Sequence, residues 1–291
     1  MQAYAGLPLW FVVLSAIVLG LIVGSFLNVV ILRLPRMLEA RWAAEAAAAD
    51  ASDLADTTPV SLAAPASHCP HCRTPIKAWH NVPLLGYLGL RGRCAACGHR
   101  ISALYPLVEA AAAAIACLVL YRFGLTPAGG TALLASWLLL ALAVIDARTQ
   151  LLPDVLTLSL LWLGLLASVI GIGPATAVSP ADAIIGAAAG YGVLWLVFTA
   201  FKCLTGKHGM GHGDFKLLAA LGAWLGWQQL PLVLLMASLG GSLIGIALMA
   251  TGRLDRGTPM PFGPWLAGAG WLALIAGDTI MAAYLTLSGL R

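Results

Sequence analysis

Long apolar runs constrain this chain more than any other feature of its sequence. Of its 291 residues, 60% are hydrophobic and only 10% are charged. A soluble domain of this size could not bury so much apolar surface, whereas a helix that crosses a bilayer needs about 20 consecutive apolar residues. The sequence therefore predicts an all-α, polytopic membrane helix bundle with about eight transmembrane helices. We expect the spans at 9–32, 104–122, 129–147, 155–173, 182–204, 215–230, 231–251 and 263–287.

The distribution of basic residues predicts how these spans are oriented. The first apolar run has no basic leader and no small-residue cleavage site, so we expect a retained span with its amino terminus outside. All but two of the 16 Lys and Arg residues, Arg122 and Arg291, then lie in or beside the polar segments of one side. Cytoplasmic loops of membrane proteins are enriched in Lys and Arg, so this side is predicted to face the cytoplasm. Its segments are 33–103, 148–154, 205–214 and 252–262.

The only sizeable polar segment lies between the first two spans. We expect the chain to divide into the first transmembrane helix (1–36), a linker (37–67), a cytoplasmic metal-binding module (68–103) and a transmembrane core (104–291). The linker starts as an Ala-rich stretch that predicts a short surface helix, followed by a flexible part. It carries no residues with recognisable chemistry.

Four of the six cysteines form two C-x-x-C pairs within this module. Cys69 and Cys72 make the first pair, Cys94 and Cys97 the second, and 21 residues separate the pairs. Two-residue spacing lets both sulfurs of a pair reach one ion, and four thiolates complete a tetrahedral zinc site. Four protein ligands close the coordination shell, so we expect structural zinc without a catalytic role. A redox pair or unmetallated thiols are the alternatives.

The segment between the two cysteine pairs is apolar and ends in Arg91 and Arg93. A small lobe with an aromatic, apolar face and a basic edge could lie against the bilayer surface or hold a second ligand. Nucleic acid is the other usual partner of a basic zinc module. We expect no nucleic acid here, because the arginines are few and lie beside a membrane, where positive charge is expected.

Two aspartates at the edges of apolar runs are the candidate catalytic residues. Asp146 ends one run, and Asp214 follows alternating glycines and begins another. A carboxylate at a membrane helix is costly and is functional by default. Two such acids in a water-poor site share a proton, so one acts as acid and the other as base, which activates water to attack a peptide carbonyl. Gly211 and Gly213, without Cβ atoms, would let a substrate backbone approach.

Two charged residues near this pair are predicted to support it. Asp154 lies at the same membrane edge, and Lys216 follows Asp214, where it could bind a substrate segment or a lipid group. Asp278 lies deeper in the last span and has no role that the sequence explains. Other classes stay open at this point: a buried ion pair, a proton-coupled transporter that uses the acids as a relay, or a scaffold without catalysis.

Five groups of residues together resemble one known family. These are Gly24–Pro35, the two cysteine pairs with the segment between them, Ile145–Asp154 and Gly211–Leu218, and Pro261–Pro264 closes the set. They are similar to the type IV prepilin peptidases, leader peptidase/N-methyltransferases of type IV pilus and type II secretion systems. In the GxGD motif of that family, the variable position here is His212. The resemblance covers nearly the whole chain.

The resemblance implies an intramembrane aspartic peptidase with Asp146 and Asp214 as its catalytic pair. Its substrates would be prepilins or pseudopilins, cut at their leader peptide on the cytoplasmic face of the bacterial inner membrane. It also implies S-adenosyl-L-methionine-dependent methylation of the new amino terminus, although the chain lacks a Gly-rich Rossmann signature. Asn28, Arg91, Arg93 and Glu109 are the residues expected near that cofactor. The sequence does not indicate an oligomeric state.

Overall fold

The computed structural model describes residues 6–49, 61–174, 178–206, 210–252, 255 and 260–287. Apart from two isolated β-bridges, every regular element in these ranges is helical, which confirms the predicted all-α class. Two short 3-10 helices, Ala78–Asn81 and Trp227–Gln229, accompany nine α-helices in the described ranges. The α-helices are α1 (Leu9–Ala49), α2 (Leu85–Gly89), α3 (Leu104–Phe123), α4 (Pro127–Thr149), α5 (Asp154–Ile170), α6 (Pro180–Thr205), α7 (His212–Leu225), α8 (Leu230–Ala250) and α9 (Gly263–Leu287).

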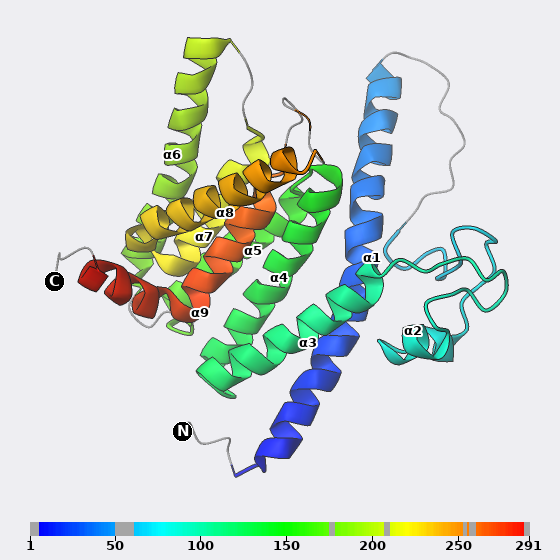
Figure 1. Ribbon diagram of the computed structural model, residues 1–291. Coiled ribbons are helices and arrows are strands. Elements are labelled where there is room, and N and C mark those ends of the chain that lie inside the picture. The colour runs from blue at the N-terminus through cyan, green and yellow to red at the C-terminus, as the bar shows by residue number, and fades with distance from the viewer. Residues whose placement is uncertain are drawn as a thin grey trace. The chain divides into compact units, whose positions relative to one another are not determined.

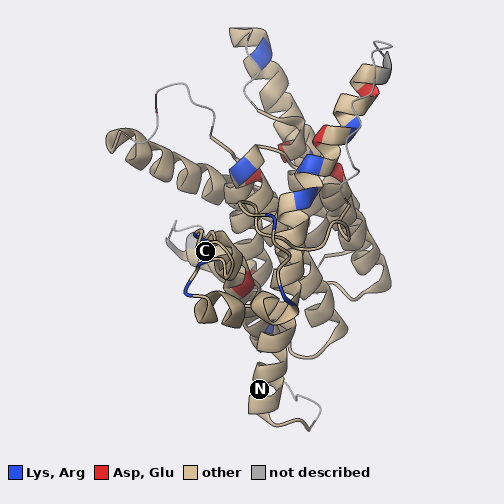
Figure 2. Ribbon diagram, turned by 90° about the vertical axis from the view of Figure 1, so that its right-hand side faces the viewer, with Lys and Arg blue, Asp and Glu red and all other residues tan. Residues whose placement is uncertain are grey.

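All eight expected spans fall on helices, but two of these helices are short. Six of them, α1, α3, α4, α6, α8 and α9, are long and apolar enough to cross a membrane. The helix α5 has 17 residues and α7 only 14, although a span was expected over 215–230. At 1.5 Å per residue, α7 is about 21 Å long, less than the roughly 30 Å of a hydrocarbon core. Figure 2 shows how little of the helical ribbon is charged.

The chain forms two compact units, which are described separately: Ala3–Leu118 and a carboxy-terminal unit that begins at Val119. In the first, α1 and α3 pack as an antiparallel pair. A Cβ on Gly20 would lie 2.5 Å from Ala113 Cα, and one on Gly24 would lie 2.7 Å from Glu109 Cα. The contact moves forward from Gly20 to Gly24 along α1 and backward from Ala113 to Glu109 along α3, so the two helices run in opposite directions. Small residues thus let the two backbones approach closely.

The helix α1 continues well past its apolar part. It runs unbroken to Ala49 with Pro35 inside it, so the short separate surface helix expected after residue 36 is wrong. The Ala-rich sequence is a strong helix former and simply extends the helix that precedes it. The Arg33 guanidinium donates hydrogen bonds to the carbonyls of Ser61 and Pro65, at 3.0 and 2.6 Å, which fastens the returning chain to α1. Residues 50–60 of the expected linker lie outside the described residues.

The short helix α7 is the centre of the carboxy-terminal unit. It contacts α5, α6, α8 and α9, among which it lies in Figure 1. Every residue from Leu217 to Leu225 is buried. A helix that is apolar all round is stable only when other elements cover every face. The neighbouring helices therefore cover a segment that is too short to cross a bilayer by itself.

Glycines bring α6 against α7 at backbone distance. A Cβ on Gly186 would lie 2.3 Å from the carbonyl oxygen of Gly222, and one on Gly190 would lie 2.5 Å from that of Leu218. The small residues of 186–190 thus form a packing surface. This contact fixes the position of α7, and with it the carboxylate in its first turn.

Candidate active site and metal-binding lobe

Asp146 is held at the end of α4. Its side chain is buried, and Oδ2 accepts a hydrogen bond of 2.9 Å from the backbone N–H of Gly263, in the first turn of α9. The helix ends at Thr149 because Gln150 takes a left-handed conformation, and the Gln150 N–H donates to the Asp146 carbonyl at 2.9 Å. The carboxylate thus lies where α4 ends and α9 begins.

Asp214 is held in the first turn of α7. It is the third residue of the helix and is also buried. The backbone N–H of Asp214 donates to the carbonyl of Gly211, the residue that precedes the helix, at 3.3 Å.

The two carboxylates form a pair in the carboxy-terminal unit. They lie close enough to interact electrostatically, as the sequence predicted. Within the described ranges neither of them forms an ion pair with a Lys, Arg or His side chain. Two carboxylates that share a buried site cannot both be charged at low cost, so one retains a proton. The arrangement therefore provides one acid and one base on the same side of the unit.

Gly263 is a site residue that the sequence reasoning did not single out. A Cβ at this position would lie 2.6 Å from Asp146 Oδ2, closer than real Cβ atoms come to a neighbour. Only glycine therefore lets the N–H of residue 263 approach the carboxylate. The available signal was its place in the Pro261–Pro264 motif, directly before the last apolar run.

The two glycines of the motif around Asp214 differ in their surroundings. The nearest atom to a Cβ on Gly211 would be Asp214 Oδ2 at 4.0 Å, so space remains beside that carboxylate. A Cβ on Gly213 would instead meet the Leu152 side chain at 2.7 Å. Gly211 thus fits the expected role of leaving room for a ligand, whereas Gly213 allows the loop before α5 to pack on α7.

Lys216 pairs within the chain. Its Nζ lies 2.6 and 2.7 Å from the two carboxylate oxygens of Asp154, the first residue of α5. The expectation that Lys216 would bind a substrate segment or lipid is therefore replaced by a contact that joins α5 to α7. His212 packs its ring 5.3 Å from those of both Phe198 and Phe215, which makes it part of an aromatic cluster.

Asp278 has one described side-chain partner. Its Oδ1 accepts a hydrogen bond of 3.4 Å from Gln229 Nε2, which links α9 to the 3-10 helix before α8. This contact lies well along α9 from Gly263, where the helix begins. Asp278 is therefore not part of the carboxylate pair.

The four cysteines of the amino-terminal unit lie on two equivalent turns. Each residue of the first turn corresponds to the residue 25 positions later, so that Cys69 matches Cys94. The Cys69 N–H donates to the Thr74 carbonyl at 3.0 Å, and the Cys94 N–H donates to the His99 carbonyl at 2.8 Å. A short antiparallel bridge closes each turn, His68 with Pro75 and Arg93 with Arg100.

The sulfur positions fit a tetrahedral metal ion. All four Sγ atoms lie within 4.8 Å of one another, and the distances Cys69–Cys97 and Cys72–Cys94 are both 3.9 Å. Four zinc–sulfur bonds of about 2.3 Å in a tetrahedron place sulfurs roughly 3.8 Å apart. His71 and His99 stack on each other with ring centroids 4.7 Å apart and are not members of this cluster.

The surroundings of Cys72 favour the thiolate that a metal requires. Its Sγ lies 3.2 Å from Thr74 Oγ1. Hydrogen bonds from the Thr74 hydroxyl and backbone lower the pKa of the Cys72 thiol to about 6. Thiolates, and not thiols, bind metal ions. The surroundings of this one cysteine therefore suit a metal ligand.

The four residues expected near S-adenosyl-L-methionine all lie in the amino-terminal unit, two of them buried and two exposed. Asn28 is buried and donates to the Tyr105 carbonyl at 3.0 Å. Glu109 is buried and accepts from the Leu84 N–H at 2.8 Å. Arg91 and Arg93 are exposed. Because the buried pair is engaged by backbone groups, we derive no methyl-transfer step from this set.

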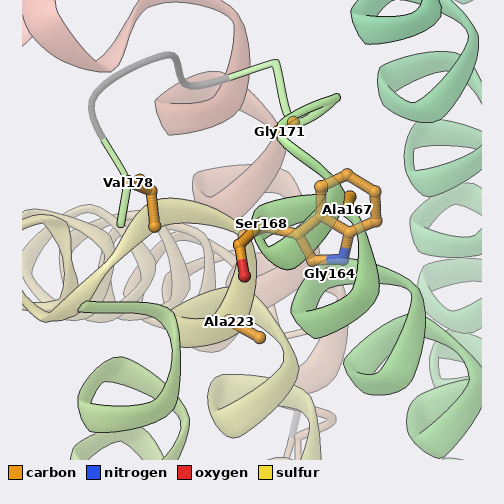
Figure 3. A pocket seen from close by; sticks show the side chains of 8 residues that line it. Gly164, Ala167, Ser168, Gly171, Val178 and Ala223 are labelled. Carbon is orange, nitrogen blue, oxygen red and sulfur yellow. The ribbon is translucent and has the colours of Figure 1, made fainter. Parts of the chain in front are cut away.

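A cavity of about 130 Å³ lies elsewhere in the carboxy-terminal unit, at the end of α5 farther from Asp154. Figure 3 shows it among small side chains, with the Ser168 hydroxyl as one of few polar groups. The indole N–H of Trp224, which also lines it, already donates to the Leu160 carbonyl at 2.8 Å. It is lined by Gly164, Ala167, Ser168, Gly171, Gly173, Val178, Ala223 and Trp224 and offers no acid, base or nucleophile pair.

Two family models match the chain and together cover most of it. The Bacterial Peptidase A24 N-terminal domain matches residues 18–123, and the Type IV leader peptidase family matches residues 132–246. The second range contains both aspartates of the pair, and the first contains the four cysteines. No solved structure matches the chain.

Curated relatives are similar over almost their whole length. A protein of Pseudomonas aeruginosa is 50% identical over 285 residues, 98% of this chain and 97% of its own. One of Aeromonas hydrophila is 53% identical over 285 residues (97% and 96%). One of Burkholderia pseudomallei is 46% identical over 292 residues (99% and 92%). Each of these relatives is named "Prepilin leader peptidase/N-methyltransferase".

The long apolar helices are those of a multi-pass membrane protein. The buried carboxylate pair has the groups that an acid–base catalyst needs. The matches make the assignment more specific. The chain belongs to the type IV leader peptidase family. Six long apolar helices and this family membership indicate a multi-pass protein of the inner membrane.

Proposed function

We propose that this protein cleaves the leader peptide of type IV prepilins or pseudopilins with the pair Asp146 and Asp214. The names of relatives about 50% identical over nearly the full chain support the reaction and the substrate class. The single observation that supports the residues is the burial of two interacting carboxylates, one of which accepts a hydrogen bond from the backbone N–H of Gly263.

The chemistry follows from the shared proton. The ionised carboxylate takes a proton from a water molecule as the water oxygen bonds to the carbonyl carbon of the scissile peptide. The protonated carboxyl then gives its proton to the peptide nitrogen, and the carbon–nitrogen bond breaks. The products are a carboxylate on the leader and a free amino terminus on the mature protein. The Gly263 N–H keeps the Asp146 carboxylate in place through these steps.

Amide variants test this assignment most directly. Asp146→Asn and Asp214→Asn keep the shape of each side chain but remove its acid–base function. We expect each to abolish cleavage of a prepilin by the purified protein, measured by intact mass. Asp278→Asn serves as the matched control, because it changes an acid outside the pair, and we expect it to cleave normally. Normal cleavage by either of the first two variants would overturn the proposal.

We propose that the carboxylate pair faces the cytoplasm. Both acids lie where the chain meets its Lys- and Arg-rich segments, which cytoplasmic loops favour. A membrane-impermeant reagent applied to cells should therefore fail to label a cysteine introduced at the exposed Arg148 but should label it in inside-out vesicles. Labelling in intact cells would place the site on the opposite side.

We propose that the protein also methylates the new amino terminus with S-adenosyl-L-methionine and that its four cysteines hold a structural zinc ion. The names of the relatives support the methyl transfer, and the positions of the four sulfur atoms support the zinc site. Bound zinc would tie the two turns of the lobe together, and S-adenosyl-L-methionine would supply the methyl group. We expect the mature product to gain the mass of one methyl group only when this compound is added.

A further inference from the structure

An exposed apolar surface covers the segment between the two cysteine turns. We call residues Lys77–Leu90, which contain the first 3-10 helix and α2, the lobe hairpin. Its side chains Trp79, Leu85 and Leu88 are each about two-thirds exposed, at 66%, 69% and 67%. Leu85 and Leu88 are three residues apart and so share one face of α2. Soluble surfaces seldom leave several large apolar side chains this exposed together.

The backbone groups of the lobe hairpin form hydrogen bonds with one another, and its apolar side chains project outward. A Cβ on Gly86 would lie 2.2 Å from the His80 carbonyl oxygen, so α2 packs directly on the preceding 3-10 helix. The N–H groups of Gly86 and Leu88 donate to the carbonyls of Val82 and Leu84. Internal pairing of this kind is what a segment needs where water is scarce.

Glu109 fastens the hairpin to α3. Its carboxylate accepts the N–H of Leu84, a residue held at a left-handed φ of 56°. Glu109 is five residues into α3, or about 7.5 Å along the axis. Its neighbour on α1 is Gly24, which lies nine residues before Arg33, the first charged residue of that helix.

We propose that the lobe hairpin inserts into the membrane interface, with Trp79, Leu85 and Leu88 among the lipid chains. The hairpin is attached through Glu109, whose side chain leans toward the start of α3, as helical side chains do. The start of α3 is the expected membrane edge. The attachment point therefore lies where the hydrocarbon region meets the lipid headgroups. Tryptophan is enriched at that depth. The partner is thus the bilayer itself, and the lobe is held to it at a third point besides α1 and α3.

The charges around the hairpin suit a bilayer that contains anionic phospholipid. Lys77 Nζ lies 5.3 Å from the centroid of the Trp79 ring, and Arg91 and Arg93 follow the hairpin as exposed residues. A basic edge beside an apolar face is the usual composition of an interfacial element. No acidic residue lies in the segment 77–93 to oppose this contact.

Photocrosslinking of the full-length protein tests the insertion. The amino acid p-benzoylphenylalanine replaces Leu88 or Leu85 in protein reconstituted into vesicles of phosphatidylethanolamine and phosphatidylglycerol. We expect lipid adducts on irradiation, seen as added lipid mass on the intact chain. The control is the same replacement at the exposed Glu45, which lies 36 residues after Leu9 on α1. That is about 54 Å along the helix, beyond a bilayer of roughly 40–45 Å.

Each outcome decides the question. Adducts at Leu85 and Leu88 that clearly exceed those at Glu45 support insertion. Adduct yields equal to those at Glu45 overturn it, as does crosslinking to a second protein chain in place of lipid. A matched size-exclusion profile for all three proteins in detergent shows that the replacements leave the chain folded. The result is independent of whether the aspartate pair cleaves prepilins.

Discussion

Asp146 depends on a residue 117 positions further along the chain, the donor Gly263. The contact uses a backbone group, so no side-chain motif announces it. The same helix α9 offers a second glycine, Gly268, around which a Cβ would meet nothing within 4 Å. Comparing an alanine substitution at Gly263 with one at Gly268 therefore distinguishes an effect on the Asp146 carboxylate from a general effect of alanine in α9.

We predict that Gly263→Ala inactivates the protein without unfolding it. The added Cβ would lie 2.6 Å from Asp146 Oδ2 and must displace the carboxylate. A misplacement of about 1 Å can cost on the order of 100-fold in rate, and we expect a loss of this size in prepilin cleavage. Gly268→Ala should cleave like the parent. Equal activity of the two variants would show that the Gly263 contact is dispensable.

The ion pair of Asp154 and Lys216 permits a prediction from charge exchange. Removing either charge, as in Asp154→Asn or Lys216→Met, should lower stability by up to about 1 kcal/mol, because the pair is partly exposed. The double exchange Asp154→Lys with Lys216→Asp should recover part of this loss. The measurement is the thermal midpoint of the detergent-solubilised protein. If the exchange is no better than the single variants, the pair does not hold α5 to α7.

At the level of elements, the packing of α6 on α7 determines where Asp214 lies. The pair Gly186 and Gly222 brings the two backbones into contact, and every residue of α7 from Leu217 to Leu225 is buried. A change in this contact would move the whole helix. Gly192, also on α6, has open space around it and provides the comparison.

Gly186→Ala is expected to destabilise the protein, whereas Gly192→Ala is not. Overpacking of a tight contact typically costs about 1–3 kcal/mol. The Gly186 variant should therefore show a lower thermal midpoint and a lower cleavage rate, since α7 carries Asp214. A midpoint unchanged from the parent would mean that the two helices can separate slightly without cost.

The repeat of the cysteine turns gives a prediction about backbone strain. Arg73 has a φ of 57° at the place where the second turn has Gly98, at 69°. A left-handed conformation costs an ordinary residue roughly 1–2 kcal/mol. We expect Arg73→Gly to retain its metal as well as the parent, and Gly98→Val to lose it more readily. Competition with a chromogenic zinc chelator measures both, and the reverse order would contradict the equivalence of the turns.

Sequence reasoning predicted the helices better than their ends. Every span predicted from an apolar run falls on a helix, because water excludes such segments wherever they occur. The continuation of α1 to Ala49 was missed, because Pro35 and the charges after Arg33 resemble a helix end. The shortness of α7 was missed as well, since a run of apolar residues does not show whether lipid or other helices cover it.

The site was predictable where its chemistry is local in sequence. Spacing and the cost of a carboxylate in a membrane single out the pair Asp146 and Asp214 and the four cysteines, and their catalytic and metal-binding roles stay predictions. The partners Asp154 for Lys216 and Gly263 for Asp146 depend on which helices pack together. Which helices pack together is determined by the whole folded chain, so the sequence of a single segment does not predict these partners.

At the scale of the molecule, the two chemistries lie in separate compact units. The cysteines belong to the unit Ala3–Leu118, and the aspartate pair belongs to the unit that begins at Val119. Each unit can therefore be perturbed by itself. Metal ligands contribute directly to the folding of a small lobe with little core.

Removal of the metal should open the lobe and leave the carboxy-terminal helices folded. After treatment with a strong chelator, limited proteolysis is expected to cut within 68–103, while the chain from Pro127 onward stays protected. Re-addition of zinc should restore resistance, and Cys94→Ser should be cut without any chelator. Mass spectrometry of the fragments gives the positions. Cleavage in α4–α9 as fast as in the lobe would show that the units are not independent.

The bond between Gly263 and Asp146 also bears on how the protein is made. Both aspartates of the pair precede α9 in the chain, so Asp146 lacks this donor until α9 has folded against it. We therefore expect a chain that is cut before Gly263 to cleave no prepilin, even though it keeps both carboxylates.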